Sequence, residues 1–160
     1  MINRQSLLRF AHKFNLILLI IATVFCLWSN PAFAHRPHDV ISQVEVSPDF
    51  QTDNTVYILV RNNFYKSTDG GSNWKRLIQG LDYTGELSSL SLSPLNKNIL
   101  YLASKSNGIY KSEDAGESWQ KVNQGLATNF INFLEIAPSD PNIAAAVGLE
   151  KGVYLTEDGG

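Results

Sequence analysis

The sequence predicts an all-β protein, because a unit of about 45 residues recurs along it and every copy contains short stretches with the periodicity of strands. Asp69, Asp114 and Asp158 mark the repeat with spacings of 45 and 44 residues, and Trp74 and Trp119 lie 45 residues apart. Self-similarity at a fixed period is typical of proteins built from repeated supersecondary units. We therefore expect one architecture throughout the repeated region.

Each unit contains four predicted strands. The first ends before Pro48, Pro94 or Pro138, because proline cannot donate to a strand ladder, and its last two apolar residues lie at i and i+2. In the first unit the next three strands are "TVYILV" (55–60), "NFYKS" (63–67) and "NWKRLI" (73–78), the last beginning at the tryptophan. No convincing helical period occurs within the units. Four strands per unit of this length predict blades of a β-propeller with four antiparallel strands each, about two and a half to three blades in all.

The N-terminal residues 1–34 have the features of a signal peptide that precedes this fold. Three basic residues come first, Leu16–Trp28 is apolar apart from one threonine, and Ala32–Ala34 has the small-x-small pattern of a cleavage site. Thirteen helical residues span about 20 Å, which is short of the ~30 Å hydrocarbon core. We expect cleavage between Ala34 and His35; a retained membrane anchor is the alternative.

Cleavage would leave a short leader (35–39) and a partial propeller (40–160) with repeats at about 40–82, 83–127 and 128–160. Of the 13 Lys and Arg, three leave with the signal peptide, so ten remain against 15 Asp and Glu, and the net charge is −5. This balance argues against a nucleic-acid partner, and we expect no stable membrane insertion after cleavage. The predicted location is periplasmic, lumenal or extracellular.

The turn between the third and fourth strands carries the most specific motif. An aspartate there can accept hydrogen bonds from nearby backbone N–H groups, and a glycine can take the positive φ of a tight turn. These turns resemble the Asp-box, or BNR repeat, with the pattern S-x-D-x-G-x-[ST]-W. The second copy matches it throughout, with Ser112, Asp114, Gly116, Ser118 and Trp119. The first copy supplies Ser67, Asp69, Gly71 and Trp74 with Asn73 in place of the hydroxyl residue, and the third begins with Thr156, Asp158 and Gly160.

The resemblance is to the Asp-box β-propeller superfamily, which includes sialidases, xyloglucan-cleaving glycosidases, sortilin-like receptors and photosystem II assembly factors. It implies that the box residues fix the fold at the propeller rim, away from a central channel where ligands bind. It further implies an exported, non-enzymatic binding or assembly module that presents blade loops to a protein or glycan partner, similar to the photosystem II assembly factors. The alternative is a fragment of a secreted glycoside hydrolase of sialidase or xyloglucanase type.

No catalytic residues and no cofactor are expected. A sialidase would bring three arginines onto a substrate carboxylate, whereas the chain beyond residue 34 has only Arg36, Arg61 and Arg76, the first of them in the leader. We also expect no metal. The alternative is a Cu(II) or Ni(II) site made by the new N-terminal amine and imidazole of His35 together with His38.

The third repeat stops within its own turn, so we expect the partial propeller to be incomplete as a folding unit. Repeat units hide their apolar faces mainly against their neighbours. Leu134, Ile136, Ile143 and Val147 would then face solvent on one side, beside an unpaired strand edge that can template pairing with another chain. The expected result is self-association through the unfinished blade. The sequence specifies neither the ligand nor the total number of blades.

Overall fold

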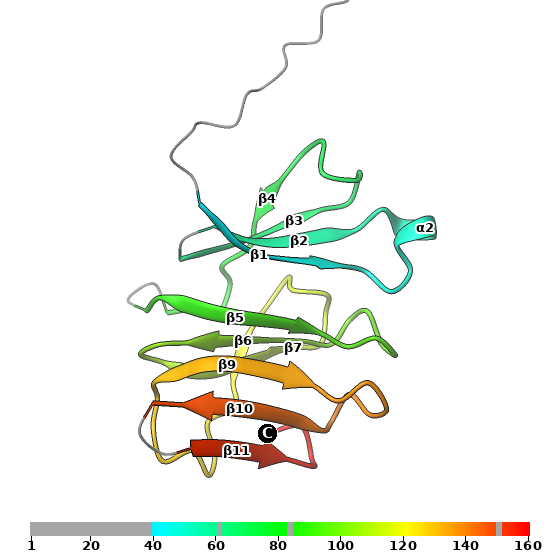
Figure 1. The fold of residues 1–160 in the computed structure, drawn as a ribbon. Helices are drawn as coiled ribbons and strands as arrows, with labels where there is room; N and C mark the ends of the chain where they lie inside the picture. Colours follow the sequence, from blue (N-terminus) through cyan, green and yellow to red (C-terminus); the bar gives the residue numbers. More distant parts are fainter. Residues whose placement is uncertain (1–39, 61, 83–84, 150–151) are drawn as a thin grey trace, which may run out of the picture. The chain divides into compact units, whose positions relative to one another are not determined.

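The computed structural model describes residues 40–60, 62–82, 85–149 and 152–160. The predicted signal peptide, its predicted cleavage site after Ala34 and the two histidines of the predicted leader, His35 and His38, lie outside these residues. The described residues form three antiparallel sheets (Figure 1), and strands that are consecutive in the sequence are neighbours in each sheet. This confirms the all-β prediction and the blade-like arrangement of strands.

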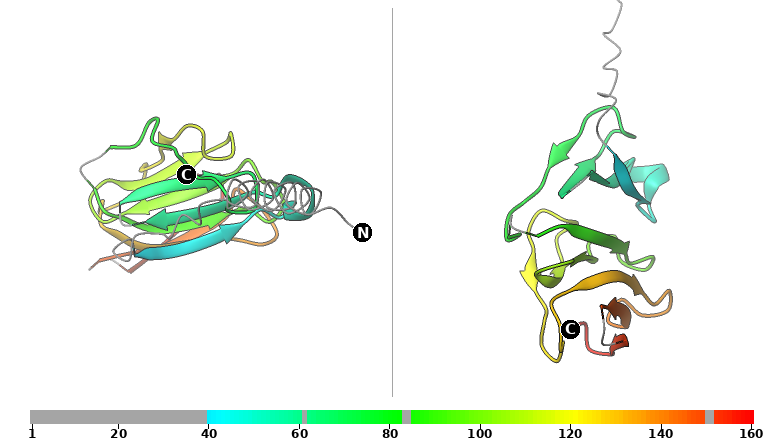
Figure 2. Two further views of the ribbon diagram at one scale, coloured as in Figure 1. Left: turned by 90° about the horizontal axis from the view of Figure 1, so that it is seen from above. Right: turned by 60° about the vertical axis from the view of Figure 1, so that its left-hand side comes forward.

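The first sheet consists of β1 (Ile41–Val46), β2 (Val56–Val60), β3 (Asn63–Ser67) and β4 (Lys75–Arg76). The second consists of β5 (Leu87–Leu92), β6 (Leu100–Ser104), β7 (Gly108–Ser112) and β8 (Gln120–Lys121). The third consists of β9 (Ile131–Ile136), β10 (Ala144–Gly148) and β11 (Gly152–Thr156). We call β1, β5 and β9 the inner strands, because they contact one another from sheet to sheet (Figures 1 and 2).

Two local features differ from the sequence prediction. The fourth strands are shorter than predicted and begin one residue after each tryptophan. In β4 and β8 alike, only two residues form pairs with the third strand. A single helical turn, α2 (Phe50–Asp53), also lies between β1 and β2. Asp53 fixes this turn, since its carboxylate accepts hydrogen bonds from Ser47 Oγ at 2.8 Å and from the Thr55 backbone N–H at 2.9 Å. One turn is too short to produce a helical period in the sequence.

Each inner strand contains a bulge near its start. The pairing skips one residue between Ile41 and Gln43 in β1, and likewise between Leu87 and Ser89 in β5. Because of the extra residue, a side chain before the bulge shares its face with the side chain three positions later, instead of two positions later. The bulge therefore explains why the first two apolar residues of each repeat are three apart while all of them share one face.

The hydrophobic core lies between the sheets. One cluster joins Tyr57, Leu59, Phe64 and Leu77 of the first repeat to Leu87, Leu90, Leu92, Leu100, Leu102, Tyr110 and Trp119 of the second. A second cluster joins Tyr101 and Ala103 of the second repeat to Ile131, Leu134, Ile136 and Ala146 of the third. β5 and β9 thus bury their apolar residues against the preceding sheet, whereas Ile41, Val44 and Val46 of β1 are 50%, 53% and 51% exposed.

The direction of this packing corrects one expectation. Leu134 and Ile136 do not face solvent, because they are 1% and 3% exposed against the second sheet. The solvent-facing apolar residues of the third sheet lie on its opposite face, where Phe133, Val147 and Val153 are 51%, 40% and 71% exposed.

Candidate functional site

The second Asp-box forms a closed network of hydrogen bonds. Ser112, buried at the end of β7, donates through Oγ to Asp114 Oδ1 at 2.8 Å and accepts from the Gly116 backbone N–H at 2.8 Å. Asp114 in turn accepts from the Ser118 backbone N–H at 2.9 Å and from Ser118 Oγ at 2.5 Å. The carboxylate is therefore engaged within its own turn.

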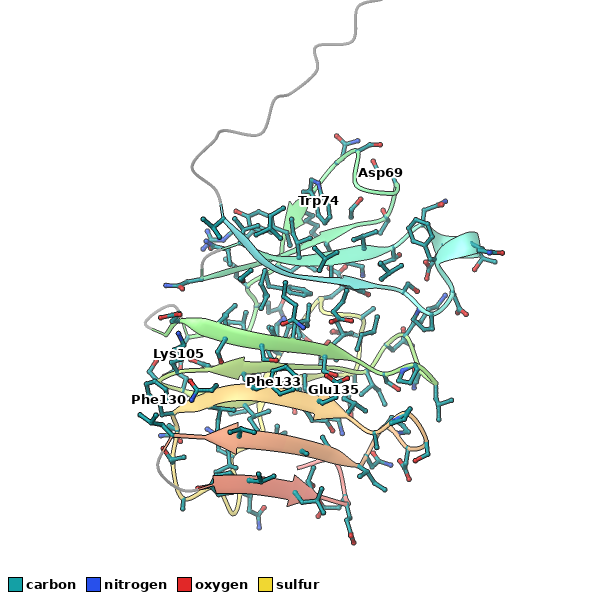
Figure 3. All side chains as sticks on the ribbon, viewed as in Figure 1. Asp69, Trp74, Lys105, Phe130, Phe133 and Glu135 are labelled. Atoms are coloured by element: carbon teal, nitrogen blue, oxygen red, sulfur yellow. The ribbon has the colours of Figure 1, made fainter. Side chains whose placement is uncertain are left out.

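The first and third boxes repeat this geometry. Asp69 accepts from Ser67 Oγ at 2.7 Å, and the Gly71 N–H donates to Ser67 Oγ at 2.9 Å. Asn73, which departs from the motif, donates to Asp69 through both its backbone and its side-chain nitrogen. Figure 3 shows Asp69 and Trp74 in this loop between β3 and β4. In the third box, the hydroxyl of Thr156 and the N–H of Gly160 both bond to Asp158.

The boxes also attach each sheet to the preceding one. Tyr101 Oη, from the second sheet, donates to the backbone carbonyl of Gly159 in the third box at 2.9 Å. Lys66 Nζ, from the first sheet, lies 3.1 Å from a carboxylate oxygen of Glu117 in the second box. These contacts show that the boxes stabilise the packing of the sheets. The three aspartates lie in three separate turns and do not form a common site.

We expect the free energy of unfolding to fall by about 1–2 kcal/mol in Asp114→Ala, because Ser118 and Ser112 lose a charged hydrogen-bond acceptor that water replaces only in part. Glu113→Ala, next to it, should change stability by no more than about 0.5 kcal/mol, since the side chain is 74% exposed and its ion pair with Lys111 lies at the surface. Denaturant titration measures both. Equal losses of stability in the two variants would contradict the conclusion that the Asp114 carboxylate stabilises this turn.

The first box predicts a loss of stability in acid. Hydrogen bonds from the backbone and side chain of Asn73, and then from Ser67, lower the pKa of Asp69 to about 2. The charged Asp69 therefore contributes to the free energy of unfolding above the unfolded-state pKa of about 3.9, and this contribution is lost as the pH falls through the folded-state pKa. Urea midpoints should therefore decrease between about pH 4 and pH 2. The urea midpoint should decrease less steeply with pH in Asp69→Asn than in the wild type. In Glu113→Gln it should decrease as steeply as in the wild type.

The inner strands carry a second polar arrangement, which sequence analysis missed. Gln43 on β1 clamps the backbone of Leu90 on β5, since its amide nitrogen donates to the Leu90 carbonyl and its amide oxygen accepts from the Leu90 N–H at 2.8 Å. Ser89 makes the corresponding pair of contacts with Leu134 on β9, at 3.3 Å each. The third position of this series is Phe133, whose side chain has no hydrogen-bonding group and is exposed.

Two carboxylates lie beside this series. Glu45 accepts from Gln43 Nε2 at 3.0 Å, and Glu135 accepts from Ser91 Oγ at 3.3 Å. Burial raises the pKa of the Glu45 carboxyl, the bond from Gln43 lowers it, and the charge of Glu135 raises it again. Glu45 and Glu135 are therefore close enough to interact, although they lie on the first and third sheets.

We call Gln43, Glu45, Phe133 and Glu135 the inner-strand surface, and Ser91, which is 2% exposed, lies buried behind Glu135; Figure 3 shows Phe133 and Glu135 on β9. The period-2 alternation of a strand places Phe133 and Glu135 on one face. The other residues of this surface lie about 90 residues earlier in the sequence, and Ser91 lies about 45 residues earlier. The one sequence signal for the surface is that Glu45 and Glu135 occupy equivalent positions of the first and third repeats.

The tyrosines that recur in the third strands are core residues. Tyr110 belongs to the same core cluster as Trp119, and the equivalent Tyr154 packs against the second cluster. No group of three or more His, Cys, Asp or Glu residues that could hold a metal occurs among the residues that the structure describes. In the same part of the chain, no helix has the length and hydropathy required to cross a bilayer.

The repeated sheets and their Asp-box turns define a β-propeller protein of the Asp-box type. A family model described as "Sortilin, neurotensin receptor 3" (Sortilin-Vps10) matches residues 62–160. The chain belongs to this family. No curated protein sequence matches the chain significantly.

Solved structures with the same fold include two groups of propellers. YCF48 from Cyanidioschyzon merolae has a TM-score of 0.58 and 22% identity, over 79% of this chain and 37% of that one. A structure of YCF48 bound to D1 peptide has a TM-score of 0.60 and 17% identity, over 76% and 38%. The GH74 enzyme of Niastella koreensis has a TM-score of 0.58 and 21% identity, over 75% and 21%. These likenesses concern the fold, and the chain spans well under half of the length of each structure.

Proposed function

We propose that the chain is an exported, non-enzymatic binding module that takes a polypeptide partner on the inner-strand surface. The observation that carries this proposal is the combination of an aromatic ring, 51% exposed at Phe133, with the carboxylates of Glu45 and Glu135, which the inner strands hold through Gln43 and Ser91. Exposed apolar side chains next to polar groups are typical of surfaces that bind other proteins.

The chemistry of this surface favours a partner segment with one apolar and one basic side chain. The apolar side chain would cover Phe133 and remove its ring from water. A lysine or arginine near Glu45 would offset the charge of Glu135 and favour the charged form of Glu45. The net charge of −5 expected after cleavage would also attract a basic segment over a distance of about one Debye length, ~8–10 Å at physiological salt.

The likeness to YCF48 bound to D1 peptide supports a polypeptide ligand and an assembly role at the level of the fold. The second candidate is a glycoside hydrolase, which the likeness to GH74 enzymes and the pair Glu45 and Glu135 favour. Glycosidases use two carboxylates, one of them with a raised pKa, as the general acid. The two functions give opposite results with the same variants.

The test is an array of synthetic peptides, the D1 peptide among them, that differ in the sign of their charge and in their apolar content. The wild-type chain should retain basic, apolar peptides, and the affinity should fall as salt is raised from about 50 to 500 mM. Glu135→Gln and Phe133→Ser should each weaken this binding at least about tenfold. Glu113→Gln, exposed on the second Asp-box, is the matched control and should bind as the wild type does.

Equal retention of acidic peptides, or binding by Glu135→Gln at wild-type strength, would contradict this proposal. A parallel assay with sialosides, β-glucan and xyloglucan should show no turnover above a heat-treated control. Turnover that is abolished in Glu45→Gln and Glu135→Gln would establish the hydrolase instead.

Export is the remaining part of the proposal. It rests on the basic start, the apolar run and the site at Ala32–Ala34. N-terminal sequencing of the protein recovered from cells should begin at His35. An intact Met1 in a membrane fraction would favour the retained anchor.

A further inference from the structure

The turn between β6 and β7 contains the only Asn-Gly dipeptide of the sequence, Asn107-Gly108. An asparagine side chain that precedes a glycine can be attacked by the peptide nitrogen of the glycine, because no side chain shields that nitrogen. The attack converts the amide into a carboxylate, and asparagine is among the thermolabile residues of proteins. This turn, which Lys105 marks in Figure 3, is therefore a candidate site of covalent modification.

The fold requires a glycine at position 108. Its φ is 81°, which is unfavourable for a residue with a Cβ. A Cβ there would also lie within 2.5 Å of the side-chain amide of Asn123, which packs against this side of the glycine. Gly108 pairs with Ser104 where the two strands end, and a three-residue loop closed by a left-handed glycine is a common hairpin. The turn geometry thus imposes the reactive half of the dipeptide.

The peptide group between Asn107 and Gly108 is held at both ends in the folded chain. The Gly108 N–H donates to the carbonyl of Asn129, in the segment between β8 and β9, at 2.8 Å. The Asn107 carbonyl accepts from Asn123 Nδ2 at 2.8 Å, and Asn123 Oδ1 accepts from the Ile109 N–H at 2.7 Å. These bonds fix the plane of the peptide group and occupy the hydrogen that its nitrogen must lose before it can attack.

The side-chain amide of Asn107 is enclosed but not bonded. Its Nδ2 atom is buried and has no hydrogen-bond partner in the described part of the chain. It lies with Ser104 Oγ and Ser106 Oγ around Gly85, where a Cβ would be within 2.6 Å of all three atoms. Packing, and not a hydrogen bond, keeps this amide in place, so that it becomes free as soon as the turn opens.

We propose that Asn107 is a site of spontaneous deamidation, which the folded hairpin keeps closed and which local separation of β6 and β7 opens. In the open turn, the Gly108 nitrogen loses its proton and forms a bond to Asn107 Cγ, and the Cγ–Nδ2 bond breaks. The amide nitrogen takes up the proton and leaves as ammonia, so that a cyclic succinimide remains. Water then opens the ring at either carbonyl, which gives aspartate or isoaspartate at this position.

The modification weakens the attachment between the second and third sheets. Isoaspartate adds a methylene group to the main chain, which displaces the Gly108 N–H from its acceptor on Asn129. Aspartate places a charge among Ser104, Ser106 and Gly85, and the burial of a charge is costly. The proposal is independent of the proposed function, because none of these residues belongs to the inner-strand surface.

The test follows the conversion by mass spectrometry of the tryptic fragment 106–111, which lies between Lys105 and the cleavage after Lys111. The purified chain is incubated at physiological temperature and mildly alkaline pH, with and without guanidinium chloride. In guanidinium chloride, Asn107 should convert at the rate of a synthetic peptide with the sequence of residues 103–113. In the folded chain the conversion should be at least about tenfold slower, because its rate follows the population of the open turn.

Asn123→Ala removes both side-chain hydrogen bonds that hold the turn, and the folded variant should convert at least about fivefold faster than the folded wild type. Asn73→Ala is the matched control, because the Asn73 side chain donates to Asp69 in the first box, outside this hairpin. It should convert as the wild type does. Circular dichroism confirms that both variants are folded, and the comparison of the folded with the unfolded wild type requires no variant.

Three results would overturn the proposal. Absence of conversion at Asn107 in guanidinium chloride would show that the turn is not a site of deamidation. Equal rates in the folded and the unfolded wild type would show that the hairpin does not keep it closed. Equal acceleration in Asn123→Ala and Asn73→Ala would assign the opening to the whole chain instead of the hairpin. None of these results bears on peptide binding at Phe133 and Glu135, so the two proposals fail separately.

Discussion

Trp119→Ala is expected to lower the free energy of unfolding by about 3–5 kcal/mol, the range for removing a large aromatic side chain from a packed core. The ring is 3% exposed and lies in the cluster that joins the first two sheets. It meets Phe64 edge-on with an interplanar angle of 87°. Its loss would leave a void that Phe64 and Gly116 border on two sides, and backbone atoms cannot close such a void cheaply.

Trp74→Ala is the matched control, since Trp74 has the same place in the first box but is only partly buried. Its loss should cost about 1–2 kcal/mol, because less apolar area leaves water on folding and no preceding sheet among the described residues covers the ring. Urea or guanidinium titration measures both variants. Equal costs would show that the box itself, and not the packing between sheets, sets the contribution of the tryptophan.

The difference between these two tryptophans shows what the sequence could predict. The repeat, the strand order and the polar residues of each turn follow from local patterns, since an aspartate two residues after a serine can reach the nearby N–H groups in any copy. The burial of each copy depends on its neighbours. Trp74 and Trp119 are therefore alike in sequence and unlike in exposure.

The inner-strand surface was not predictable for the same reason. Glu45 and Glu135 are 90 residues apart and lie on different sheets, so their proximity depends on the way the sheets pack. The error about Leu134 and Ile136 has this origin too. The strand period predicts that both residues share a face, but it does not specify whether that face meets the preceding or the following sheet.

Gly80→Ala is expected to cost about 2–4 kcal/mol, since two effects combine. Its φ of 85° is unfavourable for any residue with a Cβ, and the new Cβ would lie 2.0 Å from the Trp119 carbonyl oxygen. That oxygen belongs to the backbone just before β8, so relief of the clash requires β8 to move. The movement would lengthen the 3.0 Å bond from the Trp119 N–H to Gln79.

Gly125→Ala separates the two effects, because its φ of 80° imposes the same backbone strain while nothing lies within 4 Å of its Cβ position. We expect it to cost only about 1 kcal/mol. Equal costs for the two variants would show that backbone strain alone determines both.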